Sequence, residues 1–307
     1  SGPPGHLPLR GRIQTETSMP RAHNGDVEIE YQSFGPSHDG DRPETILLVN
    51  GLGSQMTRWP EAFCGKLAAR GYRPIRFDNR DTGLSTWPTQ LYTLADMADD
   101  GMAVLDAAGV QAAHVAGVSM GGMIVQRMAL DHADRVLSMT SIMSTTGARE
   151  AFRSTPRAAA VLNNPPPNPK INFKAFVARG VKSARVIGSP AYPWTDADIR
   201  ERVVAEYERA FNPVGVTRQR AAVMADGDRT EALRTLTMPV VVLHGEDDPL
   251  IMKIGGEATA AAIPGAELRI IPGMGHDLTP GLYDTFIDAI VTAASRASKP
   301  QENRATA

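Results

Sequence analysis

The sequence has few cysteines, little net charge and no long apolar run, and each shortage excludes a class of protein. Its 307 residues contain one cysteine, Cys64, which excludes an internal disulfide and a zinc site built from several thiolates. No stretch approaches the roughly 20 consecutive apolar residues of a membrane-spanning helix. The formal net charge is −2, so neither nucleic acid nor an anionic membrane is an expected partner.

The rest of the composition is that of a folded chain. Hydrophobic residues make up 42% and charged residues 21% of the sequence, and the length suits one large domain with an insertion. Residues 1–21 lack the apolar core of a signal peptide, and we expect a flexible arm there and a flexible tail over residues 298–307. The single cysteine lies in a helical pattern and is expected to be a structural thiol. Together these features favour a cytoplasmic location.

Short apolar runs alternate with helical patterns over residues 22–144 and 237–297. This alternation predicts an α/β fold, with a mainly parallel central sheet and helices on both faces. Residues 27–34 alternate in the manner of an edge strand. The other expected strands are residues 45–50, 74–78, 114–118, 136–143, 239–243 and 267–271, and the clearest helices are residues 94–108 and 120–130.

Residues 145–236 interrupt this alternation. They include the sequence Asn-Asn-Pro-Pro-Pro-Asn-Pro at residues 163–169, which indicates a loop or stiff connector. Thr195 begins a capping box with Asp198, and apolar residues then recur at every fourth position as far as Phe211, after which Asn-Pro ends the helix. A helical insertion between two core strands predicts a lid.

Residues 117–121 read Gly-Val-Ser-Met-Gly and match the G-x-S-x-G pattern of a nucleophile elbow. An apolar strand precedes the motif and a helix follows it, which is the context that the motif requires. The glycines allow a turn so tight that flanking side chains would collide. The turn would expose the Ser119 hydroxyl at the carboxyl end of the sheet, so Ser119 is the predicted nucleophile.

A serine hydroxyl needs a base within hydrogen-bonding reach and an acid that orients the base. His276 follows the last expected strand in a glycine-rich loop and is the predicted base. His244 is the main rival, but it closes a strand, where a structural role is expected. For the acid, Asp248 fits best because a carboxylate is usual at this position after the strand, while Asp247 stays possible.

Two backbone N–H groups normally hold the negative oxygen of a tetrahedral intermediate. One comes from the residue after the nucleophile, here Met120. The other is expected from the glycine-containing loop at residues 50–54, with Leu52 as the donor. The glycines of this loop would let the backbone approach the substrate.

The lid should form the roof of a largely apolar pocket, because a shielded acyl-enzyme requires an apolar underside. Phe176 and Trp194 are the leading candidates for the pocket wall, together with Phe173 and Tyr192. Met56, near the glycine loop, is the expected contribution of the core. Packing of the lid on the core is the alternative role for each aromatic residue. No group of His, Cys and carboxylates has metal-ligand spacing, so no metal is expected.

Taken in order, five motifs resemble those of a cap-bearing α/β-hydrolase. They cover about residues 24–295 and lie at residues 50–53, 78–85, 117–121, 245–249 and 275–276. Within that superfamily, the Asp-x-Arg-Asp-Thr-Gly segment and the Gly-Met-Gly-His ending look most like the aclacinomycin methylesterase-like esterases. The resemblance implies the α/β-hydrolase fold and cleavage of a small-molecule carboxylic ester without a cofactor.

Two positions depart from the superfamily pattern. Asn50 stands where many members have histidine, which leaves the N–H donors in place but changes what braces the loop. Asp81 replaces a common glycine, so side-chain hydrogen bonds are expected to brace its loop. Asp78 and Arg80 in the same loop are interpreted as structural residues.

The sequence leaves several functions open. A serine esterase of a small to medium, largely apolar substrate is the leading hypothesis. A perhydrolase, a carbon–carbon bond hydrolase or an acyltransferase would use the same three residues. A slow-turnover binding protein could also retain the fold. Haloalkane dehalogenases and epoxide hydrolases are excluded because they attack with a carboxylate, which the elbow lacks.

Overall fold

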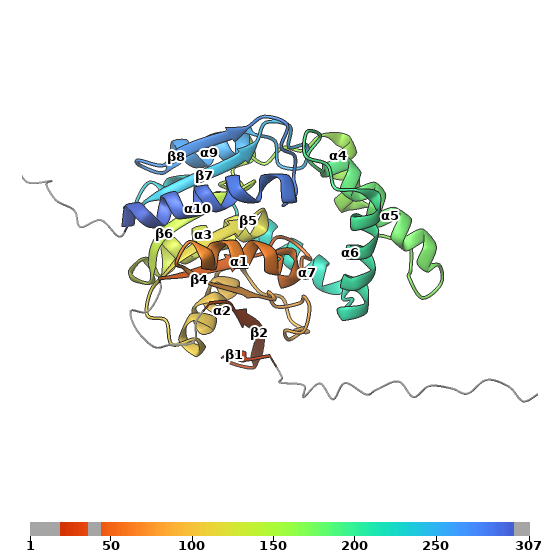
Figure 1. Cartoon of the computed structure of the whole chain (residues 1–307), viewed down its shortest axis with the longest axis horizontal. Helices are drawn as coiled ribbons and strands as arrows, with labels where there is room; N and C mark the ends of the chain where they lie inside the picture. The colour runs from red at the N-terminus through yellow and green to blue at the C-terminus, as the bar shows by residue number, and fades with distance from the viewer. Residues whose placement is uncertain (1–18, 36–43, 298–307) are drawn as a thin grey trace, which may run out of the picture.

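The computed structural model describes residues 19–35 and 44–297. The expected tail, residues 298–307, and most of the expected N-terminal arm lie outside the described residues. An eight-stranded sheet runs through the centre in the order β1-β2-β4-β3-β5-β6-β7-β8 (Figure 1). The strands are β1 (Arg21–Asn24), β2 (Val27–Ser33), β3 (Thr45–Val49), β4 (Arg73–Phe77), β5 (Ala113–Val118), β6 (Val136–Ile142), β7 (Val240–Gly245) and β8 (Glu267–Ile271).

The sheet is mainly parallel, as predicted. β2 runs antiparallel to its neighbours β1 and β4, and every pair from β4 to β8 is parallel. Parallel strands place their carboxyl ends at one edge of the sheet, so the loops after β3, β5, β7 and β8 meet there. This is the edge at which the predicted functional residues are found.

The prediction that residues 27–34 form the edge strand is wrong. β1 pairs with the outer side of β2, with Asn24 opposite Val27, and so takes the edge position. The two strands are joined by a two-residue turn in which Gly25 has a φ of 57°. β1 is only four residues long and gives no alternation signal, but the turn pair Gly25-Asp26 before an alternating run is a typical hairpin signal.

Helices cover both faces of the sheet because each central strand is apolar on both faces. In β3, Leu47 and Val49 belong to one buried cluster, while Ile46 and Leu48 belong to the other. The first cluster is covered by α2 (Leu94–Ala107), α3 (Met120–Asp131) and α9 (Ile254–Ala262), and the second by α1 (Glu61–Ala69) and α10 (Tyr283–Ala297).

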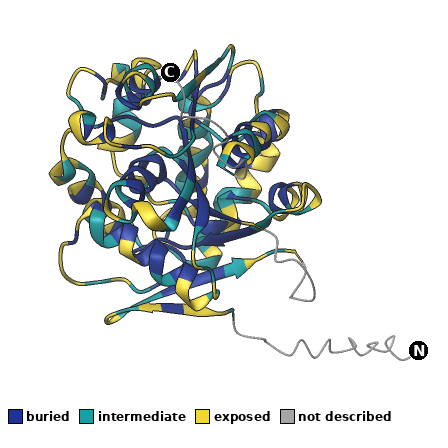
Figure 2. Ribbon diagram, turned by 90° about the vertical axis from the view of Figure 1, so that its left-hand side faces the viewer, coloured by how far each residue is buried: buried dark blue, intermediate teal, exposed yellow. Residues whose placement is uncertain are grey.

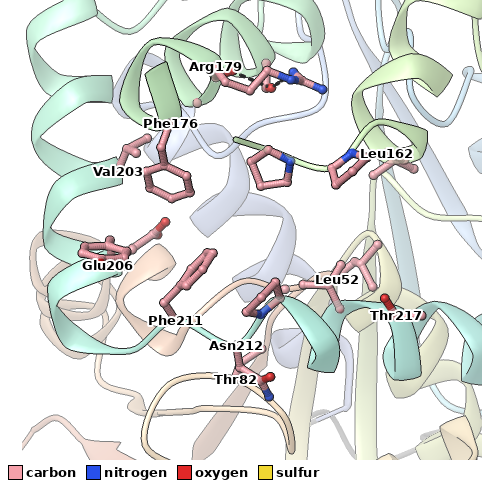
Figure 3. A pocket seen from close by; sticks show the side chains of 18 of the residues that line it. Leu52, Thr82, Leu162, Phe176, Arg179, Val203, Glu206, Phe211, Asn212 and Thr217 are labelled. Atoms are coloured by element: carbon pink, nitrogen blue, oxygen red, sulfur yellow. Dashed lines mark hydrogen bonds between the residues drawn. The ribbon is translucent and has the colours of Figure 1, made fainter. Parts of the chain in front are cut away.

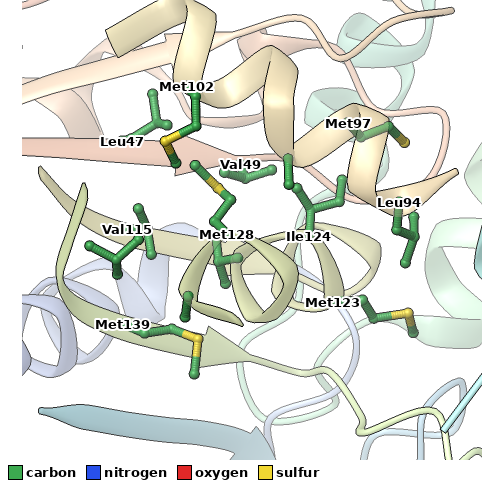
Figure 4. Close-up of a cluster of buried hydrophobic side chains, with 14 of the residues drawn as sticks. Leu47, Val49, Leu94, Met97, Met102, Val115, Met123, Ile124, Met128 and Met139 are labelled. Carbon is green, nitrogen blue, oxygen red and sulfur yellow. The ribbon is translucent and has the colours of Figure 1, made fainter. Parts of the chain in front are cut away.

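Figure 2 shows the buried sheet between these helices, whose outward faces are exposed. The first cluster is rich in methionine, and the side chains of Met97, Met102, Met123, Met128 and Met139 interdigitate there (Figure 4). Methionine is unbranched and flexible and therefore fills irregular gaps between helices and sheet.

Five helices occupy the segment between β6 and β7, and we call them the inserted helices. They are α4 (Pro156–Asn163), α5 (Phe173–Ile187), α6 (Asp196–Arg209), α7 (Pro213–Asp226) and α8 (Thr230–Leu233). α5 and α6 stand beyond the end of the sheet (Figure 1). Short 3₁₀ turns elsewhere cover Met56–Arg58, Ala133–Arg135 and Pro280–Leu282.

Thr195 caps α6, as predicted, but its backbone N–H does not complete a capping box with Asp198, and the helix ends earlier than predicted. Thr195 Oγ1 accepts a hydrogen bond of 3.1 Å from the Asp198 N–H. The helix ends at Arg209, before the last apolar position of the pattern. Asn212 caps the next helix, because its side chain accepts from the Gly215 N–H at 3.1 Å. The Asn-Pro pair thus begins α7 rather than ending α6, which is a normal use of proline in a first helical turn.

The structure also bears on two expectations, one about the single cysteine and one about membrane-spanning helices. Cys64 lies in α1 and is fully buried, and burial raises the pKa of its thiol to about 12. The thiol is therefore an unreactive core group. Within residues 19–35 and 44–297, no helix has the length and apolar character to cross a membrane.

Candidate active site

Ser119 lies at the turn between β5 and α3 in a strained conformation. Its φ of 56° and ψ of −120° fall outside the regions that non-glycine residues normally occupy. A Cβ atom at Gly117 would lie 2.1 Å from the Gly121 carbonyl oxygen, and one at Gly121 would lie 2.2 Å from the Val49 carbonyl oxygen. Both glycines of the motif are therefore required by close backbone contacts, and the turn directs the serine toward the sheet edge.

His276 comes from the loop after β8 and reaches this serine. Its Nε2 atom lies 2.9 Å from Ser119 Oγ. The His276 N–H donates to the Ile187 carbonyl at 2.6 Å, and the Gly275 N–H donates to Ser189 Oγ at 2.9 Å. The end of α5 and the residues after it therefore hold the histidine loop in place.

Asp248 completes the chain of hydrogen bonds. Its Oδ2 atom lies 2.7 Å from His276 Nδ1, and its Oδ1 atom accepts from the N–H groups of Leu250 and Ile251 at 2.8 and 3.0 Å. Burial by itself would raise the pKa of Asp248, but the charge of His276 and hydrogen bonds from His244 and His276 lower it to about 2. The carboxylate therefore stays ionised near neutral pH.

The structure separates the two alternatives that the sequence left open. Asp247 is exposed and accepts from the Gly273 N–H at 3.0 Å, so it points away from His276. His244 is fully buried in β7, with Nε2 2.7 Å from the Ile251 carbonyl oxygen and 3.5 Å from Asp248 Oδ2. His244 thus lies behind the acid rather than beside the serine.

The glycine loop after β3 lies directly against the serine. A Cβ atom at Gly51 would stand 3.1 Å from the Ser119 Cβ. A residue of the inserted helices holds the loop in place, because the Gly53 N–H donates to Oε1 of Gln219 in α7 at 2.8 Å. Leu52 and Met120, the expected oxyanion donors, both line the cavity that contains the serine.

Asp78 and Arg80, in the loop after β4, contact other protein groups. Asp78 accepts from the Met56 N–H at 2.7 Å and pairs with Arg209 at 2.7 Å. Arg80 forms a two-pronged pair with the buried Asp100 at 2.6 and 2.7 Å. These contacts agree with the interpretation of both residues as structural.

Asp81 has a φ of 71°, which explains why glycine is common at its position. The Asp81 carboxylate accepts from the Tyr92 hydroxyl at 2.7 Å and from Arg218 at 2.5 and 2.8 Å. Arg218 belongs to α7, so this loop is braced by side-chain hydrogen bonds, as expected, and it also anchors the inserted helices.

Two cavities meet above the serine. The first, of about 370 Å³, contains Ser119 and His276, and the second, of about 620 Å³, lies between α5, α6 and α7. Phe176 and Phe211 point toward the middle of the second cavity, with Leu52 at its side (Figure 3). The two spaces share the lining residues Leu52, Leu162, Gly180, Ser183 and Val203, so they form adjoining compartments.

The expected pocket residues have different positions. Trp194 lines the first cavity and Phe176 the second. The prediction for Met56 is wrong, because this side chain is fully buried in the core and lines neither cavity. Phe173 is 38% exposed and packs on Tyr207 and Phe176, outside both cavities.

Sequence reasoning missed two arginines on the wall of the first cavity, Arg58 and Arg202. Arg58 pairs with both carboxylate oxygens of Glu206. The Arg202 guanidinium lies over the Trp194 ring, 4.8 Å from its centroid. Arg202 directly precedes Val203, an apolar position of α6. Helical periodicity therefore places Arg202 beside the apolar face of the helix, but it does not show that this face lines a cavity.

No metal site accompanies these residues. Over the described ranges, no three His, Cys, Asp or Glu side chains are grouped so that they could hold a metal ion.

The central sheet, the elbow and the adjoining loops define a hydrolase-type fold, and the comparisons name its family. The sequence profile of the alpha/beta hydrolase family matches residues 46–289. This chain belongs to the alpha/beta hydrolase family, which confirms the predicted fold class.

Named relatives and solved structures agree with this assignment. A rhodomycin D methylesterase of Streptomyces sp. (strain C5) is 29% identical over 286 residues, which cover 86% of this chain and 94% of that protein. A putative carbamate hydrolase of Caulobacter sp. (strain K31) is 29% identical over an alignment that covers 89% of this chain and 98% of that protein. The match to the methylesterase confirms the family resemblance that the motifs indicated.

Two solved structures show the same fold at lower identity. The meta-cleavage product hydrolase of Pseudomonas fluorescens IP01 superposes with a TM-score of 0.75 at 20% identity, over 91% of this chain and 98% of its own. The enol-lactonase of Burkholderia xenovorans LB400 superposes with a TM-score of 0.72 at 22% identity. The superposition covers 90% of this chain and all of the enol-lactonase chain. At this identity the likeness concerns the fold alone.

Proposed function

We propose that this protein is a serine hydrolase that cleaves a carboxylic ester of a small to medium substrate through an acyl-enzyme. The observation that carries the proposal is the continuous hydrogen-bonded chain from Ser119 Oγ through His276 to Asp248. Nucleophile, base and orienting acid are the three parts that acyl transfer to a serine needs. The chain starts in a cavity and ends on a buried carboxylate.

In the first step, Ser119 Oγ attacks the ester carbonyl carbon and His276 Nε2 takes the hydroxyl proton. For this, His276 Nδ1 must carry a hydrogen and donate it to Asp248, which leaves Nε2 free to accept. The ionised Asp248 then stabilises the imidazolium. As the tetrahedral intermediate collapses, the carbon–oxygen bond to the alcohol breaks and His276 returns the proton to the leaving alcohol.

The negative oxygen of that intermediate is assigned to the N–H groups of Leu52 and Met120. Such donors contribute most when they are already in place before the charge develops. The contact of Gly51 with Ser119 and the bond from Gly53 to Gln219 hold the glycine loop in position. In the second step, His276 takes a proton from a water molecule, whose oxygen attacks the acyl carbon. The bond from that carbon to Ser119 Oγ then breaks, His276 returns the proton to Oγ, and the carboxylic acid is released.

The inserted helices act as a lid in this proposal. They supply Phe176 and Val203 to the two cavities, and the residues between α5 and α6 supply Trp194. The lining surface of both cavities is mostly apolar. Such a cover shields an acyl-enzyme from bulk water and selects substrates by shape. The rhodomycin D methylesterase, which is 29% identical over most of both chains, has a name that describes cleavage of an ester bond.

The direct test is covalent trapping. A fluorophosphonate probe should label Ser119, and an activated ester such as 4-nitrophenyl acetate should give a burst of nitrophenol equal to the enzyme concentration. The Ser119→Ala variant serves as the control and should show neither. Turnover without labelling at Ser119 would contradict the proposal, and labelling without turnover would favour the slow-turnover binding protein.

A further inference from the structure

The first cavity has one wall that does not fit a purely apolar ester. Most of its lining surface is apolar, but two cations are part of the wall. Arg202 of α6 lies there with Trp194, from the residues before that helix, and Arg58, from the 3₁₀ turn Met56–Arg58, pairs with Glu206 of α6. Arg58 and Arg202 are close enough to repel each other, and burial together with this repulsion lowers the pKa of Arg202 to about 10. Burial and Arg58 outweigh the attraction of Glu206 and Asp277, so this guanidinium lies in surroundings that disfavour its charge.

Two hydrogen-bond donors on this wall have no acceptor in the part of the protein that the structure describes. Among the described residues, Arg202 Nε and Trp194 Nε1 are buried without a hydrogen-bond partner. Arg58 differs, because Glu206 binds its guanidinium through two oxygens. A buried donor without a partner has lost its hydrogen bonds to water, so a ligand that accepts from it gains binding energy.

The carboxylate nearest to this wall within the cavity lining is already engaged. Asp277 Oδ1 accepts from the Ser189 N–H at 3.0 Å and from the Ser189 hydroxyl at 2.5 Å. Burial raises the pKa of Asp277 in spite of these bonds and the attraction of Arg202. Asp277 therefore offers Arg202 charge at a distance but leaves its Nε donor free.

We propose that Arg202, with the Trp194 N–H beside it, binds a carboxylate of the substrate, so that the ester cleaved at Ser119 is an anionic one. This inference rests on the proposed function and narrows its substrate class. Guanidinium is the side chain best suited to a carboxylate, since its planar fork donates two parallel hydrogen bonds. In a mostly apolar cavity, a carboxamide of the same shape has a single acceptor oxygen and no charge, and its own N–H group opposes the second donor, so it binds less well.

The test compares carboxylate esters with carboxamide analogues of the same shape. One pair places the group on the acyl side, as the 4-nitrophenyl half-ester of glutaric acid and its carboxamide. The other pair places it on the alcohol side, as the butyrate esters of 4-hydroxybenzoic acid and 4-hydroxybenzamide. In at least one pair, kcat/KM for the carboxylate should exceed that for the carboxamide by tenfold or more.

The variants then assign the effect. Arg202→Gln should lower the carboxylate-to-carboxamide ratio at least tenfold, and Arg202→Lys should retain part of it because the charge remains without the fork. Arg200→Gln is the matched control, since Arg200 is exposed on the same helix and lines neither cavity. Its ratio should stay within twofold of wild type, which excludes a general effect of charge.

A binding measurement decides the question without turnover. Calorimetric titration of wild type with benzoate and benzamide should show tighter binding of benzoate, and Arg202→Gln should abolish the difference. Equal losses on carboxylates and carboxamides, or ratios unchanged in Arg202→Gln, would overturn the anionic substrate while leaving esterase activity intact. Absence of turnover on every ester would instead refute the proposed function, and the titration would still test Arg202.

Discussion

The floor and the roof of the first cavity are built in different ways. The floor consists of loops at the ends of β3, β5, β7 and β8, and α3, which carries the serine turn, has nine buried residues among its 12. The roof comes from the inserted helices, and α5 buries only Val177 among its 15 residues. Close packing fixes the floor, whereas the roof has few contacts that hold it in one position.

This difference separates two tasks. Catalytic groups must keep their geometry to within fractions of an ångström, and the residues to which we assign catalysis lie on the closely packed floor. Recognition tolerates more variation, and a thinly packed roof can change its side chains at little cost in stability. The roof still touches the floor at defined points, such as the bond from the His276 N–H to Ile187 and the pair between Asp81 and Arg218.

The largest expected effect lies in the floor. Ser119→Ala and His276→Ala should each lower kcat by at least about three orders of magnitude, because the members of such a triad act as a unit. The measurement is steady-state hydrolysis of 4-nitrophenyl butyrate, with circular dichroism to verify the fold. If Ser119→Ala kept more than about a tenth of the wild-type activity, the assignment of the nucleophile would be wrong.

The next effect distinguishes two neighbouring carboxylates. Asp248→Asn should reduce kcat by about three to four orders of magnitude, because an amide favours the wrong tautomer of His276. Asp247→Asn should change kcat less than about threefold, since Asp247 is exposed and bonds to Gly273. Both variants are measured with the same ester. The reverse ranking would transfer the role of the acid to Asp247.

The floor could be predicted from the sequence because its signals are local. Residues 267–271 were expected as a strand and form β8, and the glycines around Ser119 mark a turn that other residues cannot adopt. The roles then follow from the order of the motifs along the chain. Asp248 was separated from Asp247 only by a preference of the turn, and the bonds to Leu250 and Ile251 now show which side chain faces inward.

The roof and the edges could not be predicted in the same way, because their signals depend on packing between distant segments. Helical periodicity indicated the apolar face of α6 but not that Arg202 would lie over Trp194 at the cavity wall. Met56 is apolar and near the glycine loop, and nothing local distinguishes a wall residue from a core residue. The four residues of β1 are too few to alternate, and the strand was not predicted; the turn pair Gly25-Asp26 was the local signal that could have indicated it.

A smaller effect concerns stability, and it also belongs to the floor. The pKa of Asp248 is lowered to about 2 in the folded protein, against an ordinary value of about 3.9 when unfolded. The stabilisation is therefore complete above about pH 4 and is lost as the pH falls toward about 2, and it amounts to about 2 kcal/mol. Urea unfolding of wild type at about pH 5 and about pH 2.5 should show this loss.

The same unfolding experiment on Asp248→Asn should show a loss that is smaller by about 2 kcal/mol, because the amide does not titrate. Asp247→Asn keeps Asp248 and should lose as much stability as wild type. Equal losses in wild type and Asp248→Asn would mean that the buried carboxylate contributes no pH-dependent stability.

The smallest effect is expected in the roof, where the comparison predicts a change in selectivity rather than in the chemical step. Phe176 points into the second cavity from α5, so Phe176→Ala should enlarge that space and shift the ratio of kcat/KM for long over short acyl chains by about tenfold. Phe173→Ala is the matched control, because Phe173 lies on the same helix, is 38% exposed and lines neither cavity.

Hydrolysis of 4-nitrophenyl esters from acetate to decanoate, with melting temperatures for both variants, provides the measurement. A shifted ratio in Phe176→Ala alone assigns the ring to substrate selection, since both variants remove a ring from the aromatic cluster of Phe173, Phe176 and Tyr207. Equal ratios in wild type and Phe176→Ala, with a lower melting temperature, would instead make the ring a packing residue and place selectivity in the floor around Leu52.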